Sequence, residues 1–379
     1  MSGILFWYPL AGVSYQFLHY MIGLRKLGFR VYYVEDSSRC VYSPEKREIV
    51  LDPRANIARV EPLLRAHGFG DAWAYRGAHP GGECFGMSRA QILKLYREAD
   101  VLLNVTGSQE LREEHAQIKH KLYIQTDPFG CQVQLEQGDE RLRSLVDAHD
   151  VWFSFGENLG QADCLAPIDR RWLPTRQPVS LELWDAPESR AATSYRTLTT
   201  WHNQGKDVRY RGELYHWTKD REFRRFLSVP AARPQLRFEL ASDADAGSRQ
   251  ELQAHAVHAT DALESSSDPE RYRAFIHESR AELSVARDQY VRPNTGWFSD
   301  RSACYLAAGR PVILQETGFS KHIPSGRGLF SFRSEQDILG AIDAIESNYL
   351  GQCSAARELS REYFADDKVL THMLARAGL

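Results

Sequence analysis

Residues 294–301 form the segment whose residue types and spacing could most readily do chemistry. Gly296 lies in a polar loop, and Ser299 or Asp300 can cap the helix that follows. The first amides of a helix have no partner inside it, and with the helix dipole they attract phosphate groups. Arg301 would add a charged, two-pronged contact. The same pattern is equally typical of a capped helix whose arginine faces water.

A proton acceptor is the second kind of chemistry that the sequence offers. Asp127 follows an apolar run at residues 122–125, and functional groups gather at the carboxyl ends of parallel strands. A carboxylate there could take the proton of an attacking hydroxyl group, although an Asp-Pro pair also suits a simple turn. His19 is a weaker candidate, since a lone histidine on a first helix is more often structural.

Metal ligands are scarce in the sequence. Asp243 and Asp245 fit a D-x-D pattern that can hold a divalent cation through phosphates, but their position favours capping of a helix. We expect that helix over residues 248–263, which would place His255 and His258 on it without a third ligand. The sequence therefore predicts no metal site and no cofactor.

Alternating strands and helices must position these residues. In the first half, a helix is expected to end near Gly28, and short apolar runs predict strands at residues 4–10, 29–34, 101–104, 122–125 and 151–155. The same rhythm restarts in the second half, with strands expected at residues 197–201, 236–240, 281–286 and 311–314. The alternation predicts an α/β fold with parallel sheets covered by helices.

The chain of 379 residues is long enough for two domains. Prolines and a polar stretch place the boundary between residues 180 and 195, so we predict domains at residues 1–185 and 195–354 and a helical end at residues 355–379. The net charge of -3 gives no general attraction to nucleic acid or to an anionic membrane. Without a spanning segment or a secretion signal, and with scattered cysteines, we expect a cytoplasmic protein.

Residues 307–313, Ala-Ala-Gly-Arg-Pro-Val-Ile, resemble the end of the donor-binding helix in GT-B glycosyltransferases. Further segments resemble that superfamily at residues 212–219, 315–319, 328–332 and 355–364. The resemblance implies two Rossmann-like domains that face each other across a cleft, with the acceptor bound mainly by the first and the nucleotide sugar by the second. It also implies that the C-terminal helix crosses back to the first domain.

The activity implied by this resemblance is transfer of a sugar, hexosyltransferase-like, from a nucleoside diphosphate sugar such as a UDP-sugar to a hydroxyl-bearing acceptor. No metal would be required. The catalytic candidates are Asp127 and His19. The donor and phosphate contacts would come from Gly12, Lys219, Thr295, Gly296, Ser299, Asp300, Arg301, Ser302, Thr317 and Gly318. A nucleotide-sugar 2-epimerase of the same fold and a catalytically silent nucleotide-sugar-binding protein stay open as alternatives.

Two departures from the superfamily pattern concern its usual contacts. Cys304 stands where many members have the carboxylate that holds the donor ribose, and the earlier glutamate of the E-x7-E pattern is also absent. The first loop has Val13 and Ser14 where many inverting members have a histidine. Ribose recognition and the catalytic base must therefore differ from the common arrangement.

Overall fold

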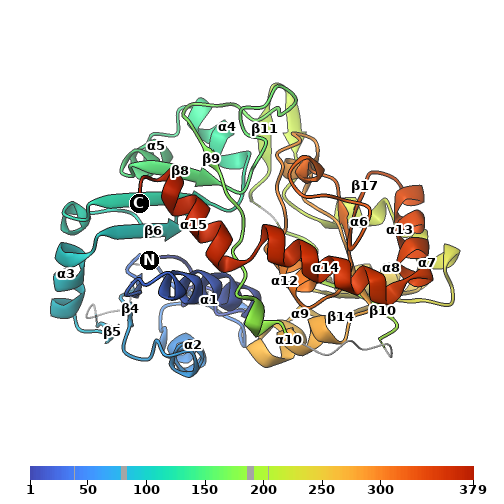
Figure 1. Ribbon diagram of the computed structural model, residues 1–379, viewed down its shortest axis with the longest axis horizontal. Helices are drawn as coiled ribbons and strands as arrows, with labels where there is room; N and C mark the ends of the chain where they lie inside the picture. Colours follow the sequence, from blue (N-terminus) through green and yellow to red (C-terminus); the bar gives the residue numbers. More distant parts are fainter. Residues whose placement is uncertain (38, 78–82, 186–191, 204) are drawn as a thin grey trace.

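The computed structural model describes residues 1–37, 39–77, 83–185, 192–203 and 205–379. Two α/β domains lie side by side, and the C-terminal helices run across both (Figure 1). Residues 186–191, which form part of the predicted domain boundary, lie outside the described residues.

The N-terminal domain is built on parallel strands in the order of a doubly wound fold. These strands are β1 (Tyr33–Glu35), β4 (Trp73–Tyr75), β6 (Val101–Val105), β7 (His120–Gln125), β8 (Val151–Ser154) and β9 (Leu173–Pro174). The first residues of the chain lie between β1 and β6: Ser2 pairs with Asn104, and the amide of Val34 donates to the Met1 carbonyl at 2.9 Å. The spatial order of these parallel strands is therefore 3-2-1-4-5-6-7, counting the N-terminal segment as the first strand and the short β9 as the last.

The strand expected at residues 4–10 is wrong, because only the residues before it join the sheet. The amide of Tyr8 donates to the Ile4 carbonyl at 2.9 Å, which folds this apolar run into a turn. The buried carboxyl group of Glu35 accepts the Phe6 amide at 2.8 Å and holds the turn in the core. A short apolar run does not by itself distinguish a strand from another buried segment.

Helices and a hairpin surround this sheet. Helix α1 (Ala11–Lys26) follows the turn and ends as predicted, with Gly28 at a φ of 92° and the Phe29 amide bonded to the Leu24 carbonyl. The other elements are β2 (Val41–Ser43), β3 (Glu48–Val50), α2 (Arg54–Ala66), β5 (Phe85–Gly86), α3 (Arg89–Glu98), η1 (Glu113–His115), α4 (Gly130–Glu136) and α5 (Glu140–Asp147).

The C-terminal domain repeats the order 3-2-1-4-5-6 of the first six of these strands. Its sheet runs β14 (Val257–Asp261), β13 (Arg237–Ser242), β10 (Ser194–Thr199), β15 (Ala281–Ser284), β16 (Val312–Gln315) and β17 (Leu329–Phe332), all parallel. The helix expected over residues 248–263 is wrong in its second half, since α8 (Ala246–Ala254) ends early and β14 follows. Ala256, at a φ of 59°, reverses the chain between them, so His258 lies on a strand.

The remaining elements of this domain are mostly short. They are β11 (Val208–Tyr210), β12 (Glu213–Tyr215), α6 (Asp220–Arg224), α7 (Val229–Ala232), α9 (Ala262–Ser266), α10 (Pro269–His277), α11 (Asp288–Val291), α12 (Asp300–Ala307), η3 (Phe319–Lys321) and α13 (Glu335–Ser347). The predicted strands at residues 197–201, 236–240, 281–286 and 311–314 correspond to β10, β13, β15 and β16.

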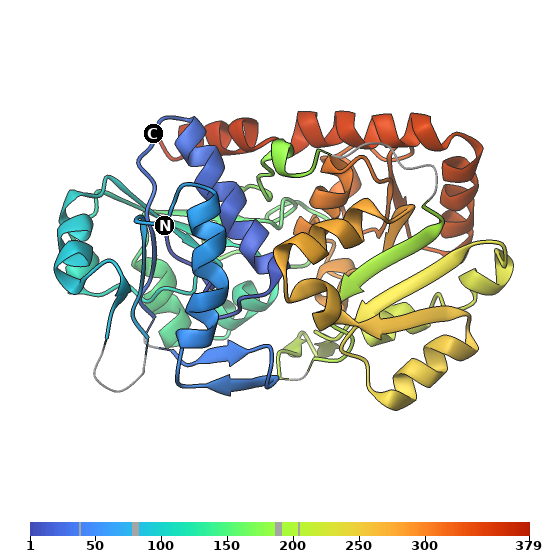
Figure 2. The same cartoon turned by 90° about the horizontal axis from the view of Figure 1, so that it is seen from below.

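The chain crosses back to the first domain through two helices rather than the single one expected from residue 355. Helix α14 (Tyr349–Tyr363) packs on α12, and α15 (Asp366–Arg376) packs on α1. Both run along one side of the molecule in Figure 2. A Cβ atom at Gly23 would lie 2.5 Å from Leu370, so the close packing of α15 on α1 requires a glycine there.

The linker between the domains runs beside this crossing. It includes η2 (Leu181–Leu183), and the Val179 amide donates to the Phe364 carbonyl at 2.7 Å. Among the described residues, no helix is long and apolar enough to cross a membrane.

Candidate active site

The loop before α12 caps its helix as the sequence predicts. The Ser299 hydroxyl accepts the Ser302 amide at 3.4 Å, and Asp300 is the first residue of the helix. Burial raises the pKa of the half-buried Asp300 carboxyl group, while the Arg301 charge beside it acts in the opposite direction. The hydroxyl group of Ser302 is buried without a partner among the described residues.

Lys219 is a buried cation that no described residue neutralises directly. Its side chain lies just before α6, the residue is 6% exposed, and none of the described groups gives its ammonium a hydrogen bond or an ion pair. Burial lowers its pKa well below the usual value, and the charges of Arg301 and Arg287 lower it further. Since burying a charge without a partner is costly, the site is suited to an anion.

Arg301 does not point where the sequence suggested. Its guanidinium forms an ion pair with the fully buried carboxylate of Glu282, at 2.5 Å, and donates to the Ser284 hydroxyl at 2.7 Å. It also donates to the Leu198 carbonyl of β10 at 2.6 Å. The arginine therefore joins α12 to the sheet, and its role as a direct phosphate ligand is corrected to a role in the scaffold.

Arg287 is the cation that sequence reasoning missed. It follows β15 at the carboxyl end of that strand, stacks over the Trp217 ring at 3.8 Å, and donates to the Trp217 carbonyl. It lies within electrostatic range of Lys219 and Tyr290. The rule that selected Asp127, that functional groups gather at the carboxyl ends of strands, could have found Arg287 as well.

Asp127 meets the second domain at the end of β7. Its exposed carboxylate accepts a hydrogen bond from the buried hydroxyl group of Tyr290, which lies on α11. The neighbouring carbonyl of Thr126 accepts the Trp297 indole at 3.1 Å. The charge of Asp127 contributes to the raised pKa of Asp300, so the two carboxylates lie within electrostatic range across the interface.

His19 is not placed to act as a base. The ring is fully buried; the Ser180 amide donates to Nδ1 at 3.0 Å, and the Trp184 indole lies 3.2 Å from Nε2. Burial lowers the pKa of His19 to about 3. The Cys304 sulfur lies 3.9 Å from Nε2, so this cysteine packs against the histidine between the domains.

The glycines and threonines predicted to contact the donor lie in the loops around α12, where the two glycines pack against the first domain. A Cβ atom at Gly296 would lie 2.7 Å from the Asn158 amide, and one at Gly318 would lie 2.1 Å from the Asn158 side chain. The hydroxyl groups of Thr295 and Thr317 are buried and donate to backbone carbonyls, at 3.3 and 2.5 Å. The two glycines therefore let the first domain approach the loops around α12, and the two threonine hydroxyl groups fix those loops within the C-terminal domain.

Two further expectations concern Gly12 and the D-x-D pattern. Gly12 lies in the first turn of α1, where a Cβ atom would be 3.6 Å from the Tyr272 hydroxyl of the other domain. Asp245 caps α8 through the Ser248 amide at 2.7 Å, and Asp243 accepts the Trp201 amide, so both carboxylates serve the backbone. Within the described ranges, no three His, Cys, Asp or Glu side chains group so that they could hold a metal ion.

No protein-family model and no curated protein matches the sequence. Among solved structures, a glycosyltransferase from Rickettsia africae ESF-5 has a TM-score of 0.54 at 10% identity and covers 100% of this chain and 96% of its own. Anabaena HepE in complex with UDP-glucose has a TM-score of 0.53 at 10% identity, over 97% and 96% of the two chains. Sucrose-phosphate synthase from Thermosynechococcus elongatus has a TM-score of 0.51 at 13% identity, over 94% and 91%.

These similarities extend over both domains of the chain and over nearly the whole of the matched structures. Together with the repeated strand order and the helices that cross back, they identify the fold as the two-domain GT-B fold. The fold predicted from the sequence resemblance is therefore confirmed.

Proposed function

We propose that this protein is a glycosyltransferase that moves a sugar from a nucleoside diphosphate sugar to a hydroxyl-bearing acceptor. The observation that carries the proposal is the buried, unpartnered ammonium of Lys219, together with Arg287, in a GT-B fold. A UDP-sugar is the first donor to test, because HepE has the same fold and was crystallised with UDP-glucose.

Sugar transfer requires positive charges near the leaving diphosphate and a proton acceptor near the attacking hydroxyl group. Lys219 and Arg287 would balance the negative charge that develops on the departing diphosphate, and the start of α12 would add its free amides. Two fixed cations can supply this stabilisation without a metal ion. Asp127 would accept the proton of the acceptor hydroxyl, and the hydrogen bond from Tyr290 would hold its carboxylate in place.

Nucleotide binding tests the donor site. We expect UDP, or another nucleoside diphosphate, to raise the melting temperature of the protein, and Lys219→Met to weaken its binding about 10- to 100-fold, the value of a charged hydrogen bond. Lys368→Met is the matched control, because that lysine is 50% exposed and pairs with Glu362 on the surface. If the two variants bind nucleotide equally well, the donor site lies elsewhere.

Product analysis separates transfer from the two alternatives that the fold allows. A nucleotide-sugar 2-epimerase would convert the donor without any acceptor. A silent binding protein would hold nucleotide and turn over nothing across an acceptor panel. The transferase proposal requires nucleoside diphosphate release that depends on an acceptor.

A further inference from the structure

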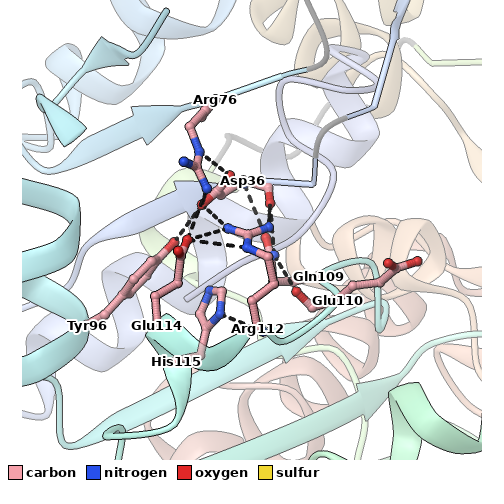
Figure 3. A network of polar contacts seen from close by, with 8 residues as sticks. All are labelled: Asp36, Arg76, Tyr96, Gln109, Glu110, Arg112, Glu114 and His115. Atoms are coloured by element: carbon pink, nitrogen blue, oxygen red, sulfur yellow. Dashed lines mark hydrogen bonds and ion pairs between the residues drawn. The ribbon is translucent and has the colours of Figure 1, made fainter. Parts of the chain in front are cut away.

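A closed network of charges fixes the carboxyl edge of the N-terminal sheet next to β1. The buried carboxylate of Asp36 accepts two hydrogen bonds from Arg76, at 2.7 and 2.9 Å, and a further one from Arg112 (Figure 3). Both arginines also pair with Glu114, at 3.0 and 2.7 Å. Each charge in this network has an opposite charge beside it. The network therefore holds the segment after β1 in position and does not require a ligand.

Arg39, a few residues further along the same segment, has no such partner. No described residue gives its guanidinium a hydrogen bond or an ion pair, and the guanidinium lies over the face of the Trp7 ring, 4.6 Å from the ring centroid. The side chain is half-buried, and burial lowers its pKa. Its backbone is held, because its carbonyl accepts the Tyr75 hydroxyl at 3.2 Å. A half-buried guanidinium on a fixed backbone thus presents its donors without a bound counter-ion in the part of the chain that the structure describes.

The nearby carboxyl groups do not neutralise Arg39. Burial raises the pKa of Glu35 to about 8, so this carboxyl group is largely uncharged at neutral pH. Glu110 lies within electrostatic range, but its carboxylate points away from the Asp36 network and is bound by Arg141 (Figure 3). Among the described residues, the positive charge of Arg39 therefore has only distant electrostatic interactions and no directly bound counter-ion.

Aromatic rings beside Arg39 extend toward the C-terminal domain. Trp7 contacts Tyr8, with ring centroids 5.0 Å apart, and Tyr8 stacks on Tyr42 at 5.5 Å. All three side chains are half-buried, and the Tyr42 hydroxyl lies within electrostatic range of Asp243 and Asp261, at the carboxyl ends of β13 and β14. The rings and the guanidinium therefore lie where the carboxyl edges of the two domains approach each other.

We propose that Arg39, over Trp7 and beside Tyr8 and Tyr42, binds the carboxylate or phosphate group of an acidic sugar acceptor. This inference rests on the proposed transferase function and names the class of its acceptor. Arginine binds both anions through two parallel hydrogen bonds, and aromatic faces pack against the apolar face of a sugar ring. The acceptor hydroxyl would then be presented from the N-terminal domain toward the donor.

Direct binding to the UDP-loaded protein tests the proposal without requiring turnover. The probes are glucuronate and glucose 6-phosphate, which carry the two anions, and glucose, which carries neither. We expect one or both anionic probes to bind about 10- to 100-fold more tightly than glucose, and Arg39→Gln to remove that difference. Arg39→Lys should restore part of it, since it keeps the charge but not the planar pair of donors.

The controls separate this inference from the donor site. Arg89→Gln, at an exposed position on α3, should leave all three affinities unchanged. Arg39→Gln should bind UDP like the wild-type protein, whereas Lys219→Met should bind UDP about 10- to 100-fold more weakly. Equal affinity for all three probes, no binding of the anionic probes, or a preference that survives in Arg39→Gln would each overturn the proposal. Which anionic probe binds distinguishes a carboxylate from a phosphate.

Discussion

The central strands of the two domains share one order. At the carboxyl edge of each sheet, one buried carboxylate is paired with arginine and one cation has no partner among the described residues. The N-terminal edge has Asp36 closed by two arginines and leaves Arg39 open. The C-terminal edge has Glu282 closed by Arg301 and leaves Lys219 open. The comparison indicates that the paired arginines stabilise the fold, whereas the cation without a partner indicates an anion-binding site.

The two edges differ in the side chains that lie beside the unpaired cation. This difference is why we assign the donor diphosphate to one domain and the acceptor to the other. A second cation, Arg287, lies near Lys219, as a diphosphate would require, whereas aromatic rings lie beside Arg39. The N-terminal edge also supplies the exposed carboxylate of Asp127, which is held by a tyrosine from the other domain.

The largest effect is expected for Asp127→Asn, which removes the proposed proton acceptor. Turnover should fall about 10²- to 10⁴-fold, the usual contribution of a general base, while nucleotide affinity stays nearly unchanged. Tyr290→Phe should lower turnover less, because it removes only the hydrogen bond that positions the carboxylate. Steady-state kinetics with saturating donor would measure both variants, and wild-type turnover in Asp127→Asn would exclude this carboxylate as the base.

Disrupting the buried ion pair of Glu282 and Arg301 should lower the stability of the fold rather than the affinity for nucleotide. Glu282→Gln leaves the Arg301 guanidinium buried without a counter-ion, and the free energy of unfolding should fall by about 3–5 kcal/mol. Urea unfolding followed by circular dichroism measures the change. If the variant stays as stable as the wild-type protein but loses nucleotide affinity, Arg301 belongs to the ligand site and the comparison of closed and open charges fails.

Removing the charge of Lys219, which has no partner among the described residues, should instead raise the free energy of unfolding. Lys219→Met replaces a buried cation that has no partner with an apolar side chain of similar length. We expect the free energy of unfolding to rise by about 1–3 kcal/mol, although nucleotide binding is weakened. The same urea titration without nucleotide measures it. A marked loss of stability would mean that Lys219 has a structural partner and is not waiting for an anion.

The sequence was informative wherever one element decides the outcome. The cap at Ser299, the helix end at Gly28 and the short apolar strands could all be predicted, because local spacing determines them. The direction of a guanidinium could not, since Arg301 turns inward toward Glu282, a residue on another strand. The resemblance supplied the fold and Lys219, but the burial that leaves this lysine unpartnered depends on packing between distant segments.

The glycines of the donor loop show the same limit in another form. Gly296 and Gly318 were predicted as phosphate contacts, yet each is needed so that Asn158 of the other domain can approach. A glycine in a sequence indicates that space or an unusual backbone angle is needed, but it does not say what occupies the space. His19 and Cys304 likewise contact each other across the domains, which no spacing along the chain could indicate.

The pH dependence of stability tests the neutral carboxyl group of Glu35, which lies near Arg39. The pKa of Glu35 is raised by burial from 4.5 to about 8 in the folded protein. The folded state therefore holds a proton that the unfolded state releases, so the stability associated with this group is complete below about pH 4.5 and falls as the pH rises toward 8. Glu35→Gln cannot titrate, so its stability relative to the wild-type protein should be higher at pH 8.5 than at pH 5, by about 4 kcal/mol. Urea unfolding of both proteins at the two pH values measures this difference, and the buried histidines titrate equally in both and cancel.

If the difference is the same at both pH values, Glu35 is ionised in the folded protein and would itself neutralise Arg39, which would remove the reason for an acidic acceptor.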